Sequence, residues 1–183
     1  TIPATSIHFD DNFNSMNIIT FKVNNENSGI KTRLWNEIKN FKLIWCKEWD
    51  AWFEITVEID ESNELIKNIE GHSIGESELS AIKLYNIHIN TEEDIALDDY
   101  VPTILYDEDY PRASLLGRIM EKVPHYTIKY VDTTIASIQR SFSFNDISLL
   151  DAFNEIGNEI GCIFILSQKS DSNGLPERGI YVY

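Results

Sequence analysis

Alternation of apolar and polar residues dominates the first third of the chain. Residues 19–23 alternate with a period of two, and so do residues 52–59. In the second run the apolar members are Phe53, Ile55, Val57 and Ile59. Successive side chains of a strand point to opposite faces, so both runs predict strands with one buried and one solvent-facing side. Residues 43–46 and 52–59 flank a short polar connection and predict a hairpin of an antiparallel sheet.

Two further segments complete the first predicted domain. Residues 31–40 place three apolar residues at helical spacing after Thr32, a possible N-cap, and predict a short helix. Residues 65–69 alternate again and predict another strand, and two glycines follow it. We therefore expect an antiparallel β domain over residues 1–72 and place a soft boundary at residues 71–78.

The remainder of the chain alternates between helical and strand patterns. Apolar stripes at helical spacing predict helices over residues 114–122 and 148–159, and Gly161 follows the second one as a C-terminal cap. Period-two runs predict strands at 84–90, 126–131 and 138–144, and a terminal hairpin at 162–183. Strand runs followed by helix–strand alternation indicate an α+β fold. Residues 73–183 are expected to form a mixed domain with two helices packed on strands.

The two predicted helices begin with similar runs of residues. Ser114 and Ser148 each precede a Leu-Leu pair, and Glu121 and Glu155 follow at the same offset. Each helix is then followed by a predicted strand. A duplicated helix–strand unit and simple binary patterning both account for this weak repeat.

The net charge of the chain limits the classes of molecule that it can bind. The chain of 183 residues has 15 Lys and Arg against 30 Asp and Glu, a net charge of −15. Such a surface repels phosphate backbones and anionic membranes, so we expect no nucleic-acid binding. Apolar runs are much shorter than the roughly 20 residues of a membrane span, so we also expect a soluble protein without one.

The beginning of the chain and its two cysteines indicate how the protein is made. The first residues contain neither an initiator Met nor a signal-peptide pattern, and we expect an excised piece. Cys46 and Cys162 each lie in an apolar stretch. They are expected to be small buried hydrophobes in a chain assembled in a reducing cytosol.

Motifs for metal or nucleotide chemistry do not occur. The histidines at 8, 72, 88 and 125 are scattered, and no His or Cys pair has metal-ligand spacing. The acidic runs 92–94 and 107–109 lack the pattern of a calcium loop, so they are interpreted as solvated loops. No glycine-rich phosphate loop is present. We predict no cofactor and no metal.

Candidate nucleophiles have simpler interpretations. Ser114 and Ser148 stand where helix caps are expected, and Ser141 lacks the surroundings of a nucleophile elbow. Cys162 stands before an apolar run, where burial would make its thiol inert. A glycosidase needs only two carboxylates, and the sequence neither excludes nor supports such a pair. We therefore assign no catalytic residue and expect no enzyme.

The aromatic residues 45, 49, 52 and 53 form the most specific cluster. Packing is favoured over ligand stacking for Trp45 and Trp52, because aromatic stripes usually fill cores or interfaces. Trp49 is placed at the predicted turn. An exposed Trp at a hairpin tip is typical of an interface anchor.

Several short segments of the sequence resemble segments of a known protein family. They include Trp52-Phe53-Glu54-Ile55, Leu84-Tyr85-Asn86-Ile87-His88-Ile89-Asn90, Asp99-Tyr100-Val101-Pro102, Glu121-Lys122-Val123-Pro124-His125, Ile138-Gln139-Arg140-Ser141-Phe142 and Ser148-Leu149-Leu150-Asp151-Ala152-Phe153. Residues 35–166 as a whole resemble the N-terminal region of phage minor structural proteins, the tail-hub, tail-spike or tail-associated lysin proteins of siphophages and prophages of Gram-positive bacteria. None of these words is a catalytic signature.

The resemblance implies a structural role in the virion tail. Family members form a trimeric hub with a β-barrel domain at the distal end of the tail tube. They contact the distal tail protein and the tape measure, and carry receptor-binding or lytic domains downstream. The resemblance therefore implies a homotrimer in the virion tail, assembled in the host cytoplasm. A carbohydrate-binding receptor module and a fragment of a glycoside- or peptidoglycan-degrading tail enzyme remain the alternatives.

Charge and aromatic residues fit a ring around a channel. A negative wall would let DNA pass without sticking, although solubility alone explains net negative charge equally well. For a ring interface the aromatic candidates are Trp49, Tyr100, Tyr106 and Tyr110.

Overall fold

The computed structural model describes residues 2, 4–10, 17–27, 30–31, 34–89 and 104–183. The chain forms two compact units. The sheet unit comprises Thr1–Ser77 and Gln168–Pro176, and the helix–strand unit comprises Glu78–Ser167 and Glu177–Tyr183. A division at 72 and 73 into separate domains stays a prediction.

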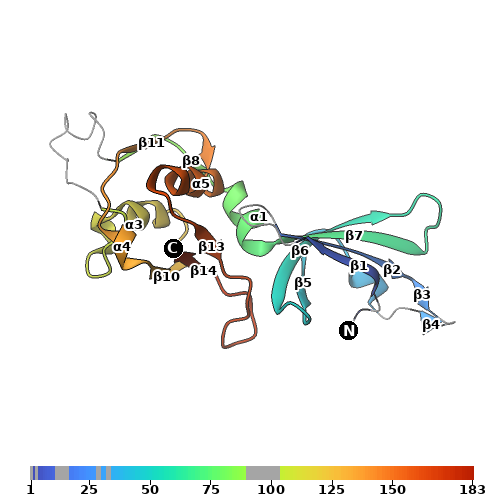
Figure 1. Cartoon of the computed structure of the whole chain (residues 1–183). Coiled ribbons are helices and arrows are strands. Elements are labelled where there is room, and N and C mark those ends of the chain that lie inside the picture. Colours follow the sequence, from blue (N-terminus) through green and yellow to red (C-terminus); the bar gives the residue numbers. More distant parts are fainter. Residues whose placement is uncertain (1, 3, 11–16, 28–29, 32–33, 90–103) are drawn as a thin grey trace. The chain divides into compact units, whose positions relative to one another are not determined.

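An open five-stranded antiparallel sheet forms the sheet unit (Figure 1). Its strands, in the order in which they pair, are β1 (Ala4–Asp10), β2 (Ile18–Asn24), β7 (Ile66–Ser73), β6 (Ala51–Ile59) and β5 (Lys42–Cys46). The short pair β3 (Glu26–Asn27) and β4 (Ile30–Lys31) lies outside this sheet. Among the described strands, β1 and β5 are edges and do not pair with each other, so a barrel would need further strands to close it.

Alternation sets the faces of this sheet, as predicted. Ile19, Phe21 and Val23 of β2 are buried, as are Phe53 and Ile55 of β6. The alternation ends early in β6, because Ile59 is 58% exposed. The predicted hairpin is confirmed by β5 and β6, in which Trp45 and Trp52 are cross-strand partners.

Two predictions for the first part of the chain were wrong. The expected helix over residues 31–40 is a single 3-10 turn, η1 (Trp35–Glu37), and residue 32 lies outside the described residues. The glycines do not interrupt the structure, because Gly71 lies inside β7 and Gly75 in the helix α1 (Ile74–Ala81), which the pattern did not predict. Gly71 is needed for close packing, since a Cβ there would lie 2.7 Å from Ile19 Cγ2.

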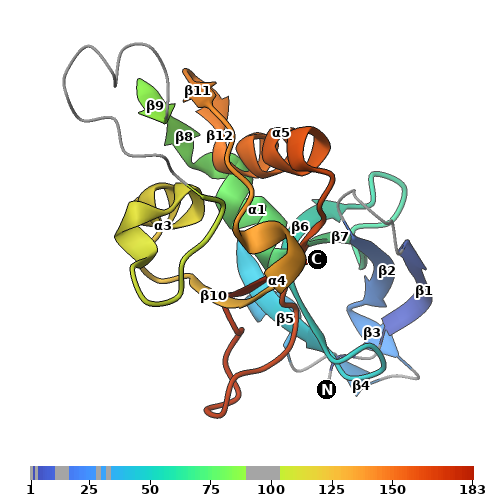
Figure 2. The same cartoon turned by 60° about the vertical axis from the view of Figure 1, so that its left-hand side comes forward.

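The helix–strand unit confirms an α+β fold (Figure 2). Its helical elements are η2 (Pro111–Ala113), α3 (Leu115–Met120), α4 (Thr133–Ala136) and α5 (Leu149–Ile160). A mixed three-stranded sheet has the order β10 (Thr127–Val131), β14 (Gly179–Val182) and β13 (Phe164–Leu166). Two short antiparallel pairs join β11 (Phe142–Phe144) to β9 (Ile87–Ile89) and β12 (Ile147–Ser148) to β8 (Lys83–Leu84).

Local signals explain both long helices of this unit. Ser114 and Ser148 cap α3 and α5, and Gly161 adopts the left-handed conformation after α5 with φ of 80°. The predicted strand over residues 84–90 is broken in two, since Asn86 has a positive φ between β8 and β9. The predicted terminal hairpin is confirmed by β13 and β14.

Candidate functional site

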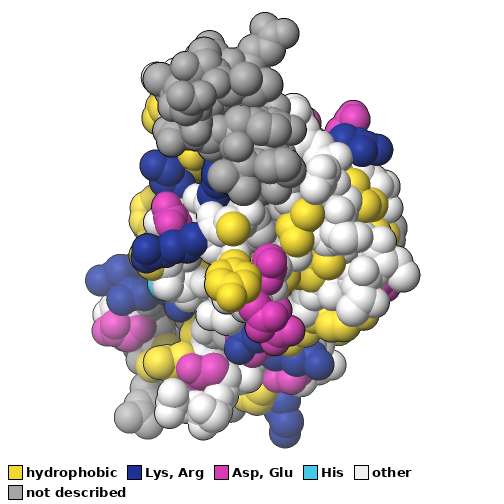
Figure 3. All heavy atoms as spheres, turned by 90° about the vertical axis from the view of Figure 1, so that its left-hand side faces the viewer, with side chains coloured by type: hydrophobic (Ala, Val, Ile, Leu, Met, Phe, Trp, Pro, Cys, Tyr) yellow, Lys and Arg dark blue, Asp and Glu magenta, His cyan; other side chains and the backbone are white. Residues whose placement is uncertain are grey.

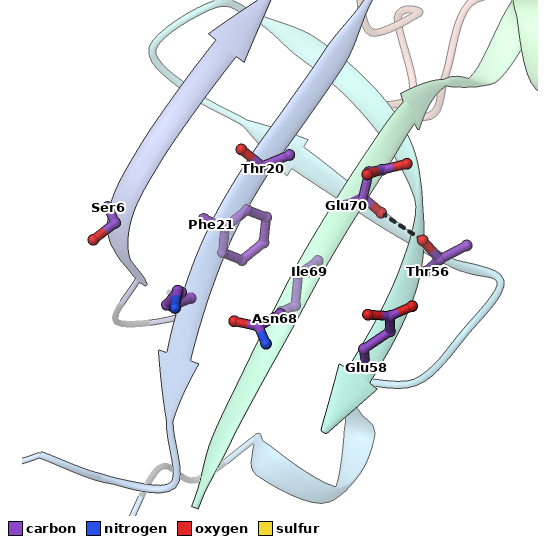
Figure 4. Close-up of a pocket in the computed structure, with 9 residues that line it drawn as sticks. Ser6, Thr20, Phe21, Thr56, Glu58, Asn68, Ile69 and Glu70 are labelled. Atoms are coloured by element: carbon purple, nitrogen blue, oxygen red, sulfur yellow. Dashed lines mark hydrogen bonds between the residues drawn. The ribbon is translucent and has the colours of Figure 1, made fainter. Parts of the chain in front are cut away.

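A shallow polar hollow lies on the outer face of the five-stranded sheet (Figure 4). It has a volume of about 260 Å³. Its polar walls come from β2, β7 and β6, because alternation turns every second residue of these strands away from the core. The outward side chains are Thr20, Lys22, Thr56, Glu58, Asn68 and Glu70.

Hydrogen bonds within the hollow fix part of its wall. Thr56 Oγ1 donates to the Glu70 carbonyl oxygen at 3.3 Å, as drawn in Figure 4, and His72 Nε2 lies 2.9 Å from Glu70 Oε1. Asn68 Oδ1 is buried and has no hydrogen-bond partner among the described atoms. The hollow can therefore offer hydroxyl, amide and carboxylate groups to a polar ligand.

The geometry of the hollow does not favour acid–base catalysis. Glu58 and Glu70 both lie exposed, whereas a general acid at neutral pH needs a carboxyl group desolvated enough to stay protonated. The carboxylate pair that the sequence left open for a glycosidase therefore gains no support in this hollow.

The aromatic cluster is divided between packing and exposure. Trp49 stacks on Phe9 with ring centroids 4.6 Å apart and is still 42% exposed. Trp52 is half-buried, and its indole N–H donates to Ser170 Oγ at 2.9 Å. Trp45 is 47% exposed, so it does not pack in the core of its own chain, and its expected contact with another subunit stays a prediction. The interpretation of Trp49 as a partly exposed tip residue is confirmed.

A cluster of charged and polar side chains joins distant parts of the helix–strand unit. Glu78 accepts hydrogen bonds from Arg178 Nε at 2.9 Å, from Arg178 Nη2 at 2.6 Å and from the Tyr126 hydroxyl at 2.8 Å. His125 Nε2 lies 3.9 Å from Glu78 Oε2. This bidentate pair fixes the start of β14 against the end of α1.

Electrostatics in this cluster follow from these contacts. Burial opposes the ionisation of Glu78, but the hydrogen bonds from Arg178 and Tyr126 and the positive charge of Arg178 outweigh it, so the pKa of Glu78 lies below its ordinary value. Burial and the neighbouring carboxylate raise the pKa of Tyr126. No sequence pattern predicted this cluster, because its acid and its arginine are 100 residues apart.

The serines singled out in the sequence have structural roles where they are buried. Ser114 accepts from the Gly117 N–H at 3.1 Å and donates to the Pro111 carbonyl at 2.5 Å. Ser148 accepts from the Asp151 N–H at 3.0 Å and donates to Asp151 Oδ2 at 2.6 Å. Their interpretation as helix caps is confirmed. Ser141 is exposed.

One serine–histidine contact was not foreseen. Ser143 Oγ lies 3.0 Å from His88 Nδ1, as cross-strand neighbours in β11 and β9. A triad also needs an oxyanion site and shielding from water, and Ser143 is exposed. The contact is a polar cross-strand pair, for which the sequence contains no long-range signal.

Both cysteines are buried, as predicted. Burial raises the pKa of the Cys46 and Cys162 thiols, which makes them poor nucleophiles. No group of three or more His, Cys, Asp or Glu in the described part of the chain could hold a metal ion. Within residues 4–10, 17–27, 34–89 and 104–183, no helix is long and apolar enough to cross a membrane.

Part of the acidic and aromatic segment of residues 92–110 lies outside the described residues. Residues 92–94 and Tyr100 belong to that part. Asp107 Oδ1 accepts from the N–H groups of Asp109 and Tyr110 at 2.9 and 3.0 Å, which forms a solvated turn. Tyr110 is 71% exposed, whereas Tyr106 is half-buried against the core of the helix–strand unit.

Comparison with solved structures identifies a similar fold. The chain matches the crystal structure of the prophage tail protein gp18 from Listeria monocytogenes EGD-e with a TM-score of 0.57 and 13% sequence identity. The match covers 97% of this chain and 43% of the Listeria protein, so this chain spans less than half of that protein's length. At this identity the likeness defines the class of fold, that of a phage tail protein.

Sequence comparisons do not add to this result. No protein-family model matches the chain. No curated protein matches it at a significant level.

Proposed function

We propose that the chain is a structural component of a phage or prophage tail. The observation that carries this proposal is the tail-protein fold, which extends over 97% of the chain. The resemblance of residues 35–166 to phage minor structural proteins points to the same role.

Within the tail, we place the chain at the distal hub or baseplate, where it would anchor receptor-binding or lytic domains. Its partners would then be the distal tail protein, the tape measure and two further copies in a ring. The support for this position is the resemblance of residues 35–166 to hub proteins. A heterologous interface that closes at three subunits needs complementary patches, and Trp49 and Tyr110 are exposed aromatic candidates for them.

An acidic channel wall is a further part of this proposal. Residues 92–109 contain eight Asp and Glu and no Lys or Arg, so they would give the wall its charge. On the described part of the face in Figure 3, acidic side chains lie among basic and hydrophobic ones.

The proposed role is not enzymatic, and this has a direct test. Purified protein incubated with host peptidoglycan or with wall polysaccharide should release no soluble fragment. Release of muropeptides or reducing sugars above a heat-denatured control would contradict a purely structural role.

A carbohydrate-binding receptor module is the second candidate, supported by the polar hollow and by the exposed ring of Trp49. Wall polysaccharide would then quench tryptophan fluorescence, and Trp49→Ala would abolish the quenching. Trp52→Phe is a matched control, because the Trp52 indole N–H is hydrogen-bonded to Ser170 and its ring is half-buried.

The tail assignment is tested genetically. A stop codon early in the gene should leave filled heads without functional tails, and expression of the gene from a plasmid should restore them. Normal infectious particles without the protein would overturn the proposal.

Ring formation is tested by light scattering of this chain across a series of salt concentrations. Copies with a charge of −15 repel each other, so association should strengthen as salt shortens the Debye length to about 8 Å near 0.15 M. A mass of 21.1 kDa at every salt concentration would mean that the ring depends on other parts of the virion. A two-fold dimer would contradict the hub, because an isologous interface does not form a three-fold ring.

A further inference from the structure

The edge strand β5 has an open side. Among the described strands it pairs with β6 alone, so alternate backbone N–H and C=O groups of β5 face away from the sheet. Such an edge is a template for another strand. Phe41, just before β5, has a positive φ of 62° and is 77% exposed. A strained backbone that presents an aromatic ring to solvent is a feature of binding sites.

An apolar groove of about 250 Å³ runs beside this edge. Buried Ile38 and Ile55, at 4% and 1% exposure, contribute to its lining. The other residues that line it are Ile2, Leu34, Glu37, Lys42, Leu43 and Ile44. The groove therefore adjoins the core of the sheet unit along β5.

The wall of the groove opposite β5 is held in place. Lys67 of β7 donates from Nζ to the carbonyl oxygens of Trp35 at 2.7 Å and Ile38 at 2.8 Å. Its ammonium group also lies 4.4 Å from the centre of the Trp35 ring. These contacts fix the turn η1, so the groove is preformed and a ligand has little ordering to induce.

The outer face of β5 is apolar as well. Leu43 and Trp45 are 43% and 47% exposed. The Trp45 indole N–H donates to Asp50 Oδ1 at 3.3 Å, which holds the ring in one orientation. A strand added beside β5 would cover apolar surface of this chain on both of its faces, in the groove and over Leu43 and Trp45.

The charged residues in and around β5 indicate which kind of strand could pair with it. Residues 38–47 contain three Lys and no Asp or Glu, in a chain with twice as many acids as bases. Lys42 and Lys47 form no ion pair with a described residue. Two copies pairing antiparallel through β5 would bring Lys42 of one copy near Lys47 of the other, and this repulsion disfavours a second copy.

We propose that β5 and the adjoining groove bind an extended acidic segment of a different polypeptide by strand addition. Backbone hydrogen bonds would supply affinity, and alternate apolar side chains would enter the groove between Ile44 and Leu34. Acidic residues at the two ends of the segment would lie within reach of the long side chains of Lys42 and Lys47, at the two ends of β5. This inference goes beyond a role in a tail and does not depend on it.

The test uses the full chain and synthetic peptides of about nine residues, a typical strand length. The acidic probe alternates Glu with Val. One comparison peptide has Lys for Glu, and a second is N-methylated at alternate positions and cannot donate its backbone hydrogen bonds. Binding is followed by Trp fluorescence and by titration calorimetry. We expect saturable binding of the acidic probe, at least about tenfold weaker binding of either comparison peptide, and weakening with salt.

Variants locate the site. Lys42→Glu with Lys47→Glu should weaken the acidic probe at least about tenfold. Lys122→Glu, at an exposed lysine after α3, should change binding less than about twofold. Thermal melts verify that each variant is folded. If the double variant does not fold, the proposal is tested by comparing the binding of the three peptides to the unchanged chain.

Several results would overturn the proposal. They are absence of binding to the folded chain, equal binding of the Lys or the N-methylated peptide, and an equal loss in Lys122→Glu. A concentration-dependent dimer that Lys42→Glu strengthens, because it replaces the repulsion between Lys42 and Lys47 with an attraction, would also overturn it and assign the edge to a second copy.

Discussion

The two units bury their apolar residues to different extents. The described core of the helix–strand unit contains 18 buried residues, and that of the sheet unit contains nine. The two units also differ in the types of large apolar residue that they expose. In the helix–strand unit they are mostly tyrosines, whereas in the sheet unit they include Phe41, Leu43, Trp45 and Trp49. The helix–strand unit thus covers its own core, and the sheet unit offers apolar surface for partners.

If the two units are separate in stability as well, a core cavity in one should leave the other folded. Phe53 and Phe153 are 0% and 1% exposed, and truncation of either to Ala should cost about 3–5 kcal/mol. Hydrogen exchange read by mass spectrometry should show lost protection in the sheet unit for Phe53→Ala and in the helix–strand unit for Phe153→Ala. Equal loss throughout the chain in both variants would mean one cooperative unit.

The groove wall of the sheet unit should depend on one lysine. Lys67→Met removes the donor to two carbonyl groups and should cost about 2 kcal/mol, measured by urea unfolding. The matched Lys22→Met, on the exposed face of β2, should cost less than about 0.5 kcal/mol. Equal effects would show that the contacts of Lys67 to Trp35 and Ile38 do not stabilise the turn.

The ion pair of the helix–strand unit should contribute a similar amount, and one that depends on pH. Glu78→Gln should cost about 2 kcal/mol at neutral pH. The pKa of Glu78 is lowered in the folded state from 4.5, so its contribution is present above pH 4.5 and is lost as the pH falls through the lower folded value. Urea unfolding at several pH values should therefore show the difference between wild type and variant shrinking in acid.

A second glutamate of the same unit is the control. Glu121→Gln alters an exposed pair with Arg112 and should change stability by less than about 0.5 kcal/mol. A difference for Glu78→Gln that stays constant from neutral pH into acid would contradict the ionic explanation.

The helix caps should have the smallest effects. Ser114→Ala and Ser148→Ala should each cost about 1 kcal/mol, measured as a lower melting temperature, and Thr at either position should restore most of it. No loss in either variant would mean that the caps predicted from sequence do not stabilise their helices.

The comparison also shows what the sequence could predict. Helix α5 was predicted because its apolar stripe, Ser148 and Gly161 are all local signals. The hairpin of β5 and β6 was predicted from its alternation. Interactions over long separations gave no such signal, and they determine the parts that were missed.

The region of residues 31–40 illustrates this limit. Its helical spacing is real, but Lys67 binds the carbonyl groups of Trp35 and Ile38 that a longer helix would use internally. The groove beside β5 and the cluster at Glu78 likewise join residues far apart in the chain. The polar hollow could be predicted only in part, because alternation gives its face but not the pairing of the strands that form it.

We have proposed that this chain is part of a virion tail. Immunogold electron microscopy of purified particles tests it most directly, with an antibody raised against the exposed turn at residues 171–175, where Leu175 is 59% exposed. We predict gold at the distal end of the tail on particles from the wild-type phage and none on particles from the stop-codon mutant. Gold on heads, or intact particles that lack the protein altogether, would contradict the claim.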